Sequence, residues 1–193
     1  MGQAEQVAEA SDKNSYIEEE FEKYITESYV VDFNGNTVET DAFEVMLTLN
    51  AEIRKPQEER NYPLFIYVNG AGEKKYVVPV RGKGLWGPIW GYIAFNDDLN
   101  TIYGAVFDHD KETPGLGSEI NTEWFQEPFT GKTIFEESGE FASIEVVKGG
   151  ADPSDPHGVD AVSGGTITSK ALEEMMKDCL TGYIKHFQQL ATN

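Results

Sequence analysis

The sequence predicts an α+β fold in which a mostly antiparallel sheet packs against helices and a long amphipathic helix closes the chain. Three observations lead to this class. Short runs of β-favouring residues occupy the middle of the chain, a polar connection joins two of them as a hairpin, and an apolar stripe at helical spacing begins at Lys170. The length of 193 residues suffices for one domain with a buried core.

Helical periodicity marks both ends of the chain. Apolar residues recur at helical intervals from Ser15 to Val31, so we expect a first helix there. Residues 1–14 are expected to be a disordered segment or linker after a missing membrane anchor, which leaves 15–193 as a single domain. A short helix is predicted over Ser118–Gln126, before Pro128. The closing helix carries an apolar stripe of Leu172, Met176, Cys179, Tyr183, Phe187 and Leu190.

The predicted strands are rich in β-branched and aromatic residues and are bounded by turn residues. Asn34–Asn36 supplies one turn, and Asn96–Asn100 connects two runs as an antiparallel hairpin. Lys148–Gly158, rich in Gly, Pro and Asp, is predicted to be a loop. The strands are expected at Phe43–Leu49, Tyr62–Val68, Tyr76–Val80, Ile89–Phe95, Thr101–Phe107 and Phe141–Val147.

Composition narrows the possible functions. The chain has 15 Lys and Arg against 34 Asp and Glu, a formal net charge of -19. A chain of this charge repels phosphate backbones and anionic membrane surfaces, which argues against nucleic-acid binding. A single cysteine, Cys179, leaves no partner for an intrachain disulfide, and the three histidines lack the spacing of metal ligands. No metal site is predicted.

The first glycine-rich motif, Gly82–Gly87, matches the GxGxxG pattern of dinucleotide-binding folds. In those folds the motif opens a helix, whose N-terminus holds the pyrophosphate. Here Pro88 follows, and the next residues continue as a strand. We therefore reject a dinucleotide site and predict a tight turn that presents Leu85 and Trp86.

The second motif, Glu112–Gly117, combines two glycines and a proline with a threonine and an acid. One interpretation is a rigid turn that leads into the helix at Ser118. The other is a binding loop, in which glycines let a flat ligand approach the backbone amides. Spacing alone leaves both interpretations open.

The third motif, Asp160–Ser169, places small residues and hydroxyls directly before the closing helix. Exposed amides and the helix dipole make such a start suitable for a phosphate. Alternatively, Thr168 or Ser169 caps the helix without any ligand. Both interpretations remain open from these residues alone.

Together the three motifs resemble the FMN-binding domain family, and the resemblance covers most of the chain. The family's flavinylation motif, Asp-x-x-Ser/Thr-Gly-Ala-Thr, is matched in register by Asp160, Ser163, Gly164, Gly165 and Thr166, with Gly165 in place of the usual Ala. The resemblance implies FMN joined through its phosphate to Thr166 by a separate flavin transferase. Thr168 is the runner-up acceptor and otherwise a phosphate ligand.

The resemblance also implies the remaining cofactor-binding residues. Thr113 and Leu116 are expected against the flavin ring, and Leu85 and Trp86 beside the isoalloxazine. Amides at the helix start would neutralise the phosphodiester, with Lys170 adding one counter-charge. No catalytic residue or metal ligand is assigned. The other residues of the expected cofactor site are Ser163, Gly164, Gly165, Ser169, Glu112 and Gly117.

The function implied by the resemblance is electron transfer. We expect a covalently flavinylated subunit of a membrane-bound, sodium-translocating NADH:quinone reductase, which does not turn over NADH alone. Its partners would be the other subunits of the complex. The expected location is the periplasmic side of a bacterial inner membrane, where a missing N-terminal helix provides the only membrane contact.

Two alternatives remain open. One is the subunit of the related ferredoxin:NAD oxidoreductase complex that shares the flavinylation motif, and the other is a non-redox module that binds a phosphate-bearing ligand. A hydrolase with Ser163 or Thr166 as nucleophile is disfavoured, because the sequence offers no base oriented by a third group.

Overall fold

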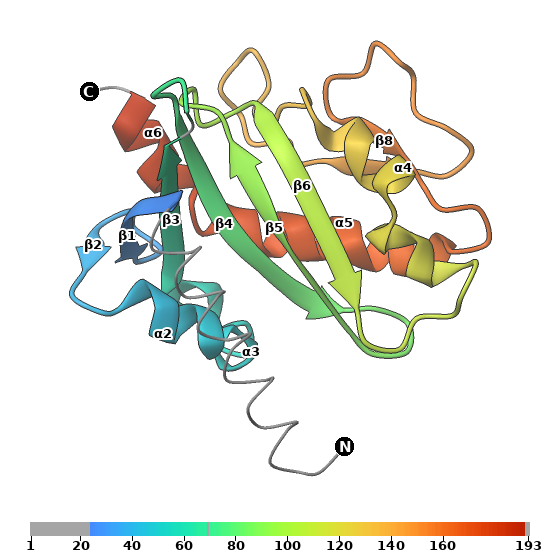
Figure 1. The fold of residues 1–193 in the computed structure, drawn as a ribbon, viewed down its shortest axis with the longest axis horizontal. Coiled ribbons are helices and arrows are strands. Elements are labelled where there is room, and N and C mark those ends of the chain that lie inside the picture. Colours follow the sequence, from blue (N-terminus) through green and yellow to red (C-terminus); the bar gives the residue numbers. More distant parts are fainter. Residues whose placement is uncertain (1–23, 69, 192–193) are drawn as a thin grey trace.

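The described part of the computed structural model, residues 24–68 and 70–191, is built on a six-stranded sheet (Figure 1). Neighbouring strands follow the order β2-β1-β3-β4-β5-β6, and every neighbouring pair is antiparallel. A separate pair, β7 (Glu145–Val147) and β8 (Gly158–Asp160), is parallel. The main sheet consists of β1 (Ile25–Val31), β2 (Thr37–Val38), β3 (Tyr62–Val68), β4 (Lys74–Lys83), β5 (Pro88–Phe95) and β6 (Ile102–His109).

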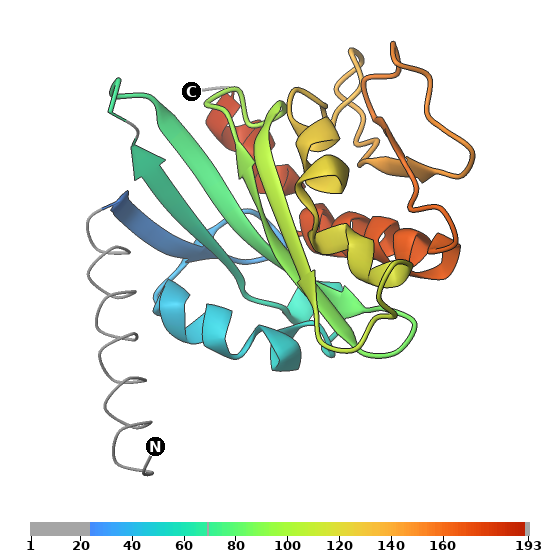
Figure 2. The ribbon, with the colours of Figure 1, turned by 45° about the vertical axis from the view of Figure 1, so that its right-hand side comes forward.

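Helices cover the two faces of the sheet unequally (Figures 1 and 2). The long helix α5 (Thr166–Thr181) lies across one face, whereas α2 (Ala42–Leu47) and α3 (Leu49–Glu52) lie on the other. Within the described residues no helix is long and apolar enough to cross a membrane. The other helical elements are η1 (Gln57–Glu59), η2 (Gly117–Asn121), α4 (Glu123–Gln126), η3 (Glu127–Phe129) and α6 (Ile184–Ala191).

The main core lies between the sheet and α5. Strand β5 shows why, because its buried residues Ile89, Ile93 and Phe95 lie on one face of the strand. Leu172 and Met176 of α5 are fully buried in the same cluster. The alternation of apolar and partly exposed residues in β5 thus specifies which face of the sheet receives the helix.

Most of the predicted elements are confirmed. Strand β3 has the predicted bounds, and β4, β5 and β6 contain or overlap the predicted runs. The hairpin between β5 and β6 is antiparallel, as expected. The segment Ser118–Gln126 is helical, although it is divided between η2 and α4. The predicted loop Lys148–Gly158 is free of helix and strand up to its last residue, which begins β8.

The predicted first helix is wrong in its second half. Residues Ile25–Val31 form strand β1, which pairs with β3. Val30 and Val31 are fully buried, so the sheet offers these residues more burial than an amphipathic surface helix would. The remainder of that prediction, 15–23, and the expected linker, 1–14, lie outside the described residues.

The predicted strand Phe43–Leu49 is also wrong, because this segment is helical. Asp41 caps α2 by accepting a hydrogen bond from the Glu44 amide at 2.8 Å. Ala42 and Val45, three residues apart, form the buried face of this helix. A cap that precedes a helical burial pattern therefore outweighs the β propensity of the individual residues.

Two further boundaries differ from expectation. Only the last three residues of Phe141–Val147 are a strand, because Ser143 has a positive φ of 66° that an extended chain cannot adopt. The closing helix begins at Thr166 and ends at Thr181, and α6 continues after a break. The break lies at Gly182, where an added Cβ would come within 1.9 Å of the Tyr62 ring.

Candidate functional site

The three motifs meet around one buried carboxylate. The Glu112 side chain accepts a hydrogen bond from the Trp86 amide at 2.8 Å and another from the Thr168 hydroxyl at 2.5 Å. Glu112 is only 4% exposed, so these bonds are sheltered from water. The Gly82–Gly87 turn, the Glu112–Gly117 turn and the start of α5 are thereby joined at one end of the molecule.

Glycines make room for this carboxylate. A Cβ at Gly84 would lie 2.6 Å from one Glu112 oxygen, and a Cβ at Gly117 would lie 2.6 Å from the other. The Gly117 Cβ would also lie 2.3 Å from the Thr168 hydroxyl oxygen. The glycines of both turns therefore have a packing reason as well as the ligand-binding reason considered from the sequence.

The hydroxyl groups of Thr166, Thr168 and Ser169, at the start of α5, lie in different environments. Thr166, the first residue of the helix, is exposed, whereas Thr168 and Ser169 are each 1% exposed. Thr168 donates to Glu112, and Ser169 accepts a hydrogen bond from the Val162 amide at 3.0 Å. The N-cap residue is Gly165, which provides no side-chain cap. Of the two interpretations left open by the sequence, the one in which Thr168 or Ser169 caps the helix is wrong. The first turn of α5 keeps amides available for an anion.

Backbone geometry explains the glycines of the third motif. Gly164 has a φ of +75°, a conformation that favours glycine, and a Cβ there would lie 2.6 Å from a Leu116 methyl carbon. At Gly165 a Cβ would lie 2.9 Å from a Val162 methyl carbon. The glycine that replaces the family's usual alanine is therefore tightly packed. Ser163 precedes this pair and is exposed.

Four large apolar side chains are exposed on the three joined segments. We call them the apolar ledge: Leu85 (42% exposed), Trp86 (63%), Leu116 (42%) and Ile167 (61%). Three of them were expected in the cofactor site. Ile167 was not assigned to the site from the sequence. An apolar residue that lies off the buried stripe of α5 is a signal that could have identified it. Exposed apolar groups gathered at one place mark a binding surface.

Two other predicted residues lie beside the ledge. Thr113 is exposed, and its carbonyl accepts hydrogen bonds from the Leu116 and Ser118 amides at 3.1 and 3.2 Å, which shapes the turn. Lys170 bonds to Glu173, and this hydrogen bond raises the pKa of Lys170 above its ordinary value. Its charge is therefore already paired within the helix. Among the described residues no cluster of His, Cys, Asp and Glu could hold a metal ion.

A sheet backed by a long helix, with an uncapped helix start beside exposed apolar turns, defines a domain suited to a phosphate-bearing planar ligand. The model of the FMN-binding domain family matches residues 84–181, just over half of the 193 residues. This range runs from the first glycine turn to the end of α5. The chain belongs to the FMN-binding domain family.

Similar proteins are named as the C subunit of one enzyme complex. The C subunit of the Na(+)-translocating NADH-quinone reductase of Vibrio vulnificus strain YJ016 is 34% identical over 183 residues, covering 87% of this chain and 71% of that protein. Its counterpart in Vibrio anguillarum is 35% identical over 172 residues, covering 81% and 67%.

Solved structures agree with this match. The crystal structure of the corresponding reductase protein from Parabacteroides distasonis is 44% identical, with a TM-score of 0.78 over 90% of this chain and 83% of that one. The structure of NqrC from Shewanella oneidensis is 29% identical, with a TM-score of 0.73 over 91% and 88%. The α+β fold, with its antiparallel sheet and closing helices, is therefore that of NqrC structures.

Proposed function

We propose that this chain is the flavin-bearing NqrC component of a sodium-translocating NADH-quinone reductase, with FMN esterified through its phosphate to Thr166. One observation carries the choice of residue. Of the two threonines in the motif, Thr166 is exposed at the first position of α5, whereas the Thr168 hydroxyl is buried and donates to Glu112. Only the first is accessible to a modifying enzyme.

The start of α5 fits a phosphodiester. Backbone amides of the first turn and the helix dipole favour a negative charge there, and Gly165 adds no side chain between them and the ligand. Ser163 and Gly164 form the exposed turn that leads to this position. Thr168 and Ser169 support the turn from inside, because their hydroxyls are already hydrogen-bonded to Glu112 and to the Val162 amide.

The apolar ledge fits the flavin ring. Leu85, Trp86 and Leu116 would contact a flavin ring attached at Thr166, and Ile167, which is also exposed, would extend the same surface. The turn that carries Leu116 is shaped by the Thr113 carbonyl and joined to the helix through Glu112. FMN supplies reversible acceptance of electrons, while the chain would orient the ring.

The similar proteins support the wider assignment. Partners would be the remaining subunits of the reductase, together with a flavin transferase that attaches the cofactor. Oxidation of NADH and reduction of quinone would take place elsewhere in the complex. The chain would lie on the periplasmic side of a bacterial inner membrane, anchored through an N-terminal helix.

Intact-mass spectrometry tests the attachment site. Co-expression of the chain with a flavin transferase should add the mass of one FMN less one water. Thr166→Val should abolish this increment, because the acceptor hydroxyl is lost. Thr168→Val, with folding checked by thermal melting, should retain it.

The reverse result would refute the assignment. If the adduct persists in Thr166→Val and disappears in folded Thr168→Val, the attachment site is the buried threonine and our interpretation of the helix start fails.

A further inference from the structure

Three residues of the Gly82–Gly87 turn, Gly82, Lys83 and Gly87, line a cavity that includes none of the predicted cofactor-binding residues. This cavity of about 680 Å³ lies between the end of β4, α3 and α5. Its lining includes Arg54, Arg81 and Lys83, and we call it the cationic cavity. Such a volume lies within the range of small-molecule sites in proteins. No residue of the apolar ledge lines it, so it is distinct from the proposed flavin site.

The grouping of these cations is unusual for so acidic a chain. The sequence has three arginines and 34 acidic residues, and two of the arginines line this cavity. In the described part of the chain, none of the three lining cations forms an ion pair with a carboxylate. The cavity therefore gathers positive charge that the protein itself leaves uncompensated.

Arg81 is held in place but incompletely bonded. It pairs with Trp90 across β4 and β5, and its guanidinium carbon lies 5.6 Å from the centre of that ring. Its Nε is buried and makes no hydrogen bond within the described residues. A buried charged donor without a partner is costly. The two terminal nitrogens of the guanidinium are not among the buried atoms and form no hydrogen bond within the described residues, so they are the donors that remain for a ligand.

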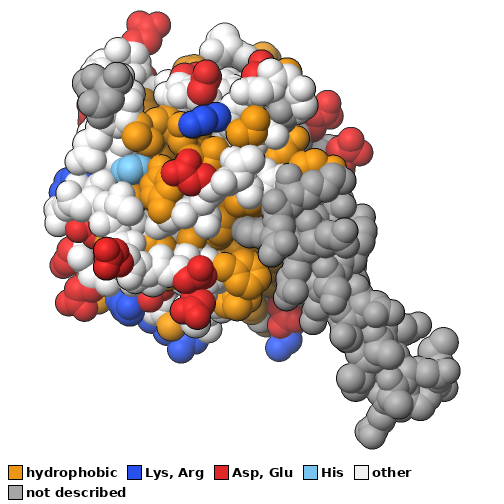
Figure 3. All heavy atoms as spheres, turned by 60° about the vertical axis from the view of Figure 1, so that its left-hand side comes forward, with side chains coloured by type: hydrophobic (Ala, Val, Ile, Leu, Met, Phe, Trp, Pro, Cys, Tyr) orange, Lys and Arg blue, Asp and Glu red, His pale blue; other side chains and the backbone are white. Residues whose placement is uncertain are grey.

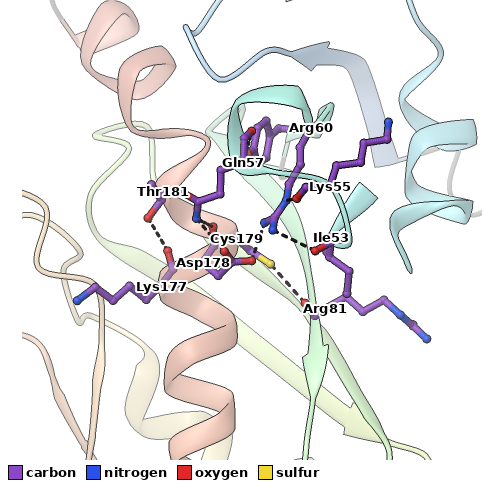
Figure 4. A network of polar contacts seen from close by, with 10 residues as sticks. Ile53, Lys55, Gln57, Arg60, Arg81, Lys177, Asp178, Cys179 and Thr181 are labelled. Carbon is purple, nitrogen blue, oxygen red and sulfur yellow. Dashed lines mark hydrogen bonds and ion pairs between the residues drawn. The ribbon is translucent and has the colours of Figure 1, made fainter. Parts of the chain in front are cut away.

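Asp178, a carboxylate in the cavity wall, is not a hydrogen-bond partner of Arg81. Asp178 accepts a hydrogen bond from Arg60 at 2.6 Å and another from Gln57 at 2.8 Å. Figure 4 shows both donors reaching Asp178, while the Arg81 side chain leads away from it. The only other acid in the lining is Glu174, an exposed residue of α5. Positive charge therefore predominates in the cavity.

We propose that the cationic cavity binds the phosphate group of a small, soluble organic phosphate. Arg81 is its principal ligand, because a guanidinium offers several donors in a geometry that suits oxyanions. Arg54 and Lys83 supply the additional charge that a dianion requires. Ile53 and Met175 provide an apolar wall for the organic part. The net charge of -19 disfavours an anionic membrane surface as the source of the phosphate.

Calorimetric titration with pyrophosphate tests this proposal. The purified full chain without flavin should bind pyrophosphate saturably in a low-salt buffer, so the result is independent of flavin attachment. Arg81→Gln should weaken binding at least about tenfold, as expected for loss of a charged hydrogen bond. Arg54→Gln, at an exposed position where folding is not at risk, should weaken binding in the same direction.

Lys148→Gln is the matched control, because it removes one exposed positive charge outside the cavity. It should change the dissociation constant less than about twofold. Absence of saturable binding by the unmodified chain would refute the site, as would equal weakening in Lys148→Gln and the arginine variants. Arginine-dependent retention on phosphatidylglycerol vesicles, with no response to pyrophosphate, would overturn the proposal in favour of a lipid surface.

Discussion

At the scale of single residues, Glu112 has the widest structural effect. Its two oxygens connect a turn 26 residues before it to a helix 56 residues after it. The sequence marks Glu112 only as an acid in a glycine-rich turn. The family resemblance indicates that Glu112 belongs to the site. It does not indicate that the carboxylate is bonded to Trp86 and Thr168, because these residues are distant in the sequence.

Glu112→Ala should destabilise the fold and reduce flavinylation. Removing the carboxylate leaves the Trp86 amide and the Thr168 hydroxyl without their acceptor, at a cost of about 2–4 kcal/mol. Glu112→Gln retains an acceptor for Trp86 and should cost less. Urea unfolding measures the first effect, and the intact mass after co-expression measures the second. Glu123→Ala, at an exposed position of α4, is the control, and an equal loss in that variant would contradict the role of Glu112.

Cys179 gives a prediction about pH. Burial raises the pKa of its thiol from 9.0 to about 11. The folded state therefore keeps the thiol neutral where the unfolded chain ionises, so its contribution is present below pH 9 and is lost as pH rises toward 11. Between pH 8 and about 10.5 the free energy of unfolding should fall by about 2 kcal/mol through this group.

Urea unfolding at both pH values, with Cys179→Ala as the comparison, isolates this contribution. Desolvation also raises the pKa of Tyr29, which has no electrostatic contact with Cys179 and contributes equally to both proteins. The pKa of Tyr183 is raised by burial and, to a smaller extent, by Cys179, so the comparison measures the thiol together with its effect on that neighbour. A pH dependence that is the same in Cys179→Ala and in the unmodified chain would show that the thiol is not responsible.

At the scale of elements, the sequence predicts a strand correctly where buried and exposed residues alternate, and it misleads where the apolar residues have no such alternation. β5 was predictable because its buried residues recur at every second position. β1 was not, because its apolar residues also fit helical spacing and only pairing with β3 decides between the two. The sequence does not predict helix α2, because the apolar residues after Asp41 suggest a strand. The capping role of Asp41 becomes evident only from its hydrogen bond in the structure.

The break between α5 and α6 was also hidden from the sequence, since the apolar stripe continues through it. Gly182 has an ordinary helical φ of -68°, so backbone freedom does not require a glycine. The constraint is Tyr62, which is 4% exposed, donates to the Gln57 carbonyl at 2.7 Å and packs edge-on against Tyr183. A fixed ring therefore occupies the place of a side chain at position 182.

Gly182→Ala should destabilise the protein by about 2 kcal/mol or more, because the added methyl would overlap a ring that cannot move. Gly104→Ala in β6 is the matched control, since no atom lies within 4 Å of its added Cβ. That control should change stability by less than about 0.5 kcal/mol. Chemical denaturation of both variants decides the matter, and similar stabilities would argue against Tyr62 as the cause of the break.

At the scale of the whole molecule, charge and apolar surface are distributed differently. Figure 3, a view toward the β1 and β2 side, shows hydrophobic side chains gathered within the face and acidic side chains spread around them. The apolar ledge and the cationic cavity share the Gly82–Gly87 turn: Leu85 and Trp86 belong to the ledge, whereas Gly82, Lys83 and Gly87 line the cavity. The predominance of acidic residues favours association with positively charged protein surfaces.

We expect the flavinylated chain to exchange electrons with a protein partner and not with a diffusible nucleotide. The ledge side chains are 42–63% exposed, so they form an open surface and not an enclosed substrate pocket. Glu112, the acid that joins the segments of the ledge, is buried and already bonded to Trp86 and Thr168, which leaves no paired acid and base for substrate chemistry among these residues. A partner surface that covers the ledge would exclude water from the ring.

Stopped-flow mixing of the reduced, flavinylated chain tests this expectation. Mixing with the adjoining subunit of the reductase should reoxidise the chain rapidly, at a rate that falls as salt rises, because a net charge of -19 steers the encounter. Mixing with excess NAD should leave it reduced on the same timescale. Rapid stoichiometric reduction of NAD by the isolated chain would show that it is an enzyme in its own right and would overturn the assignment as an electron-transfer protein.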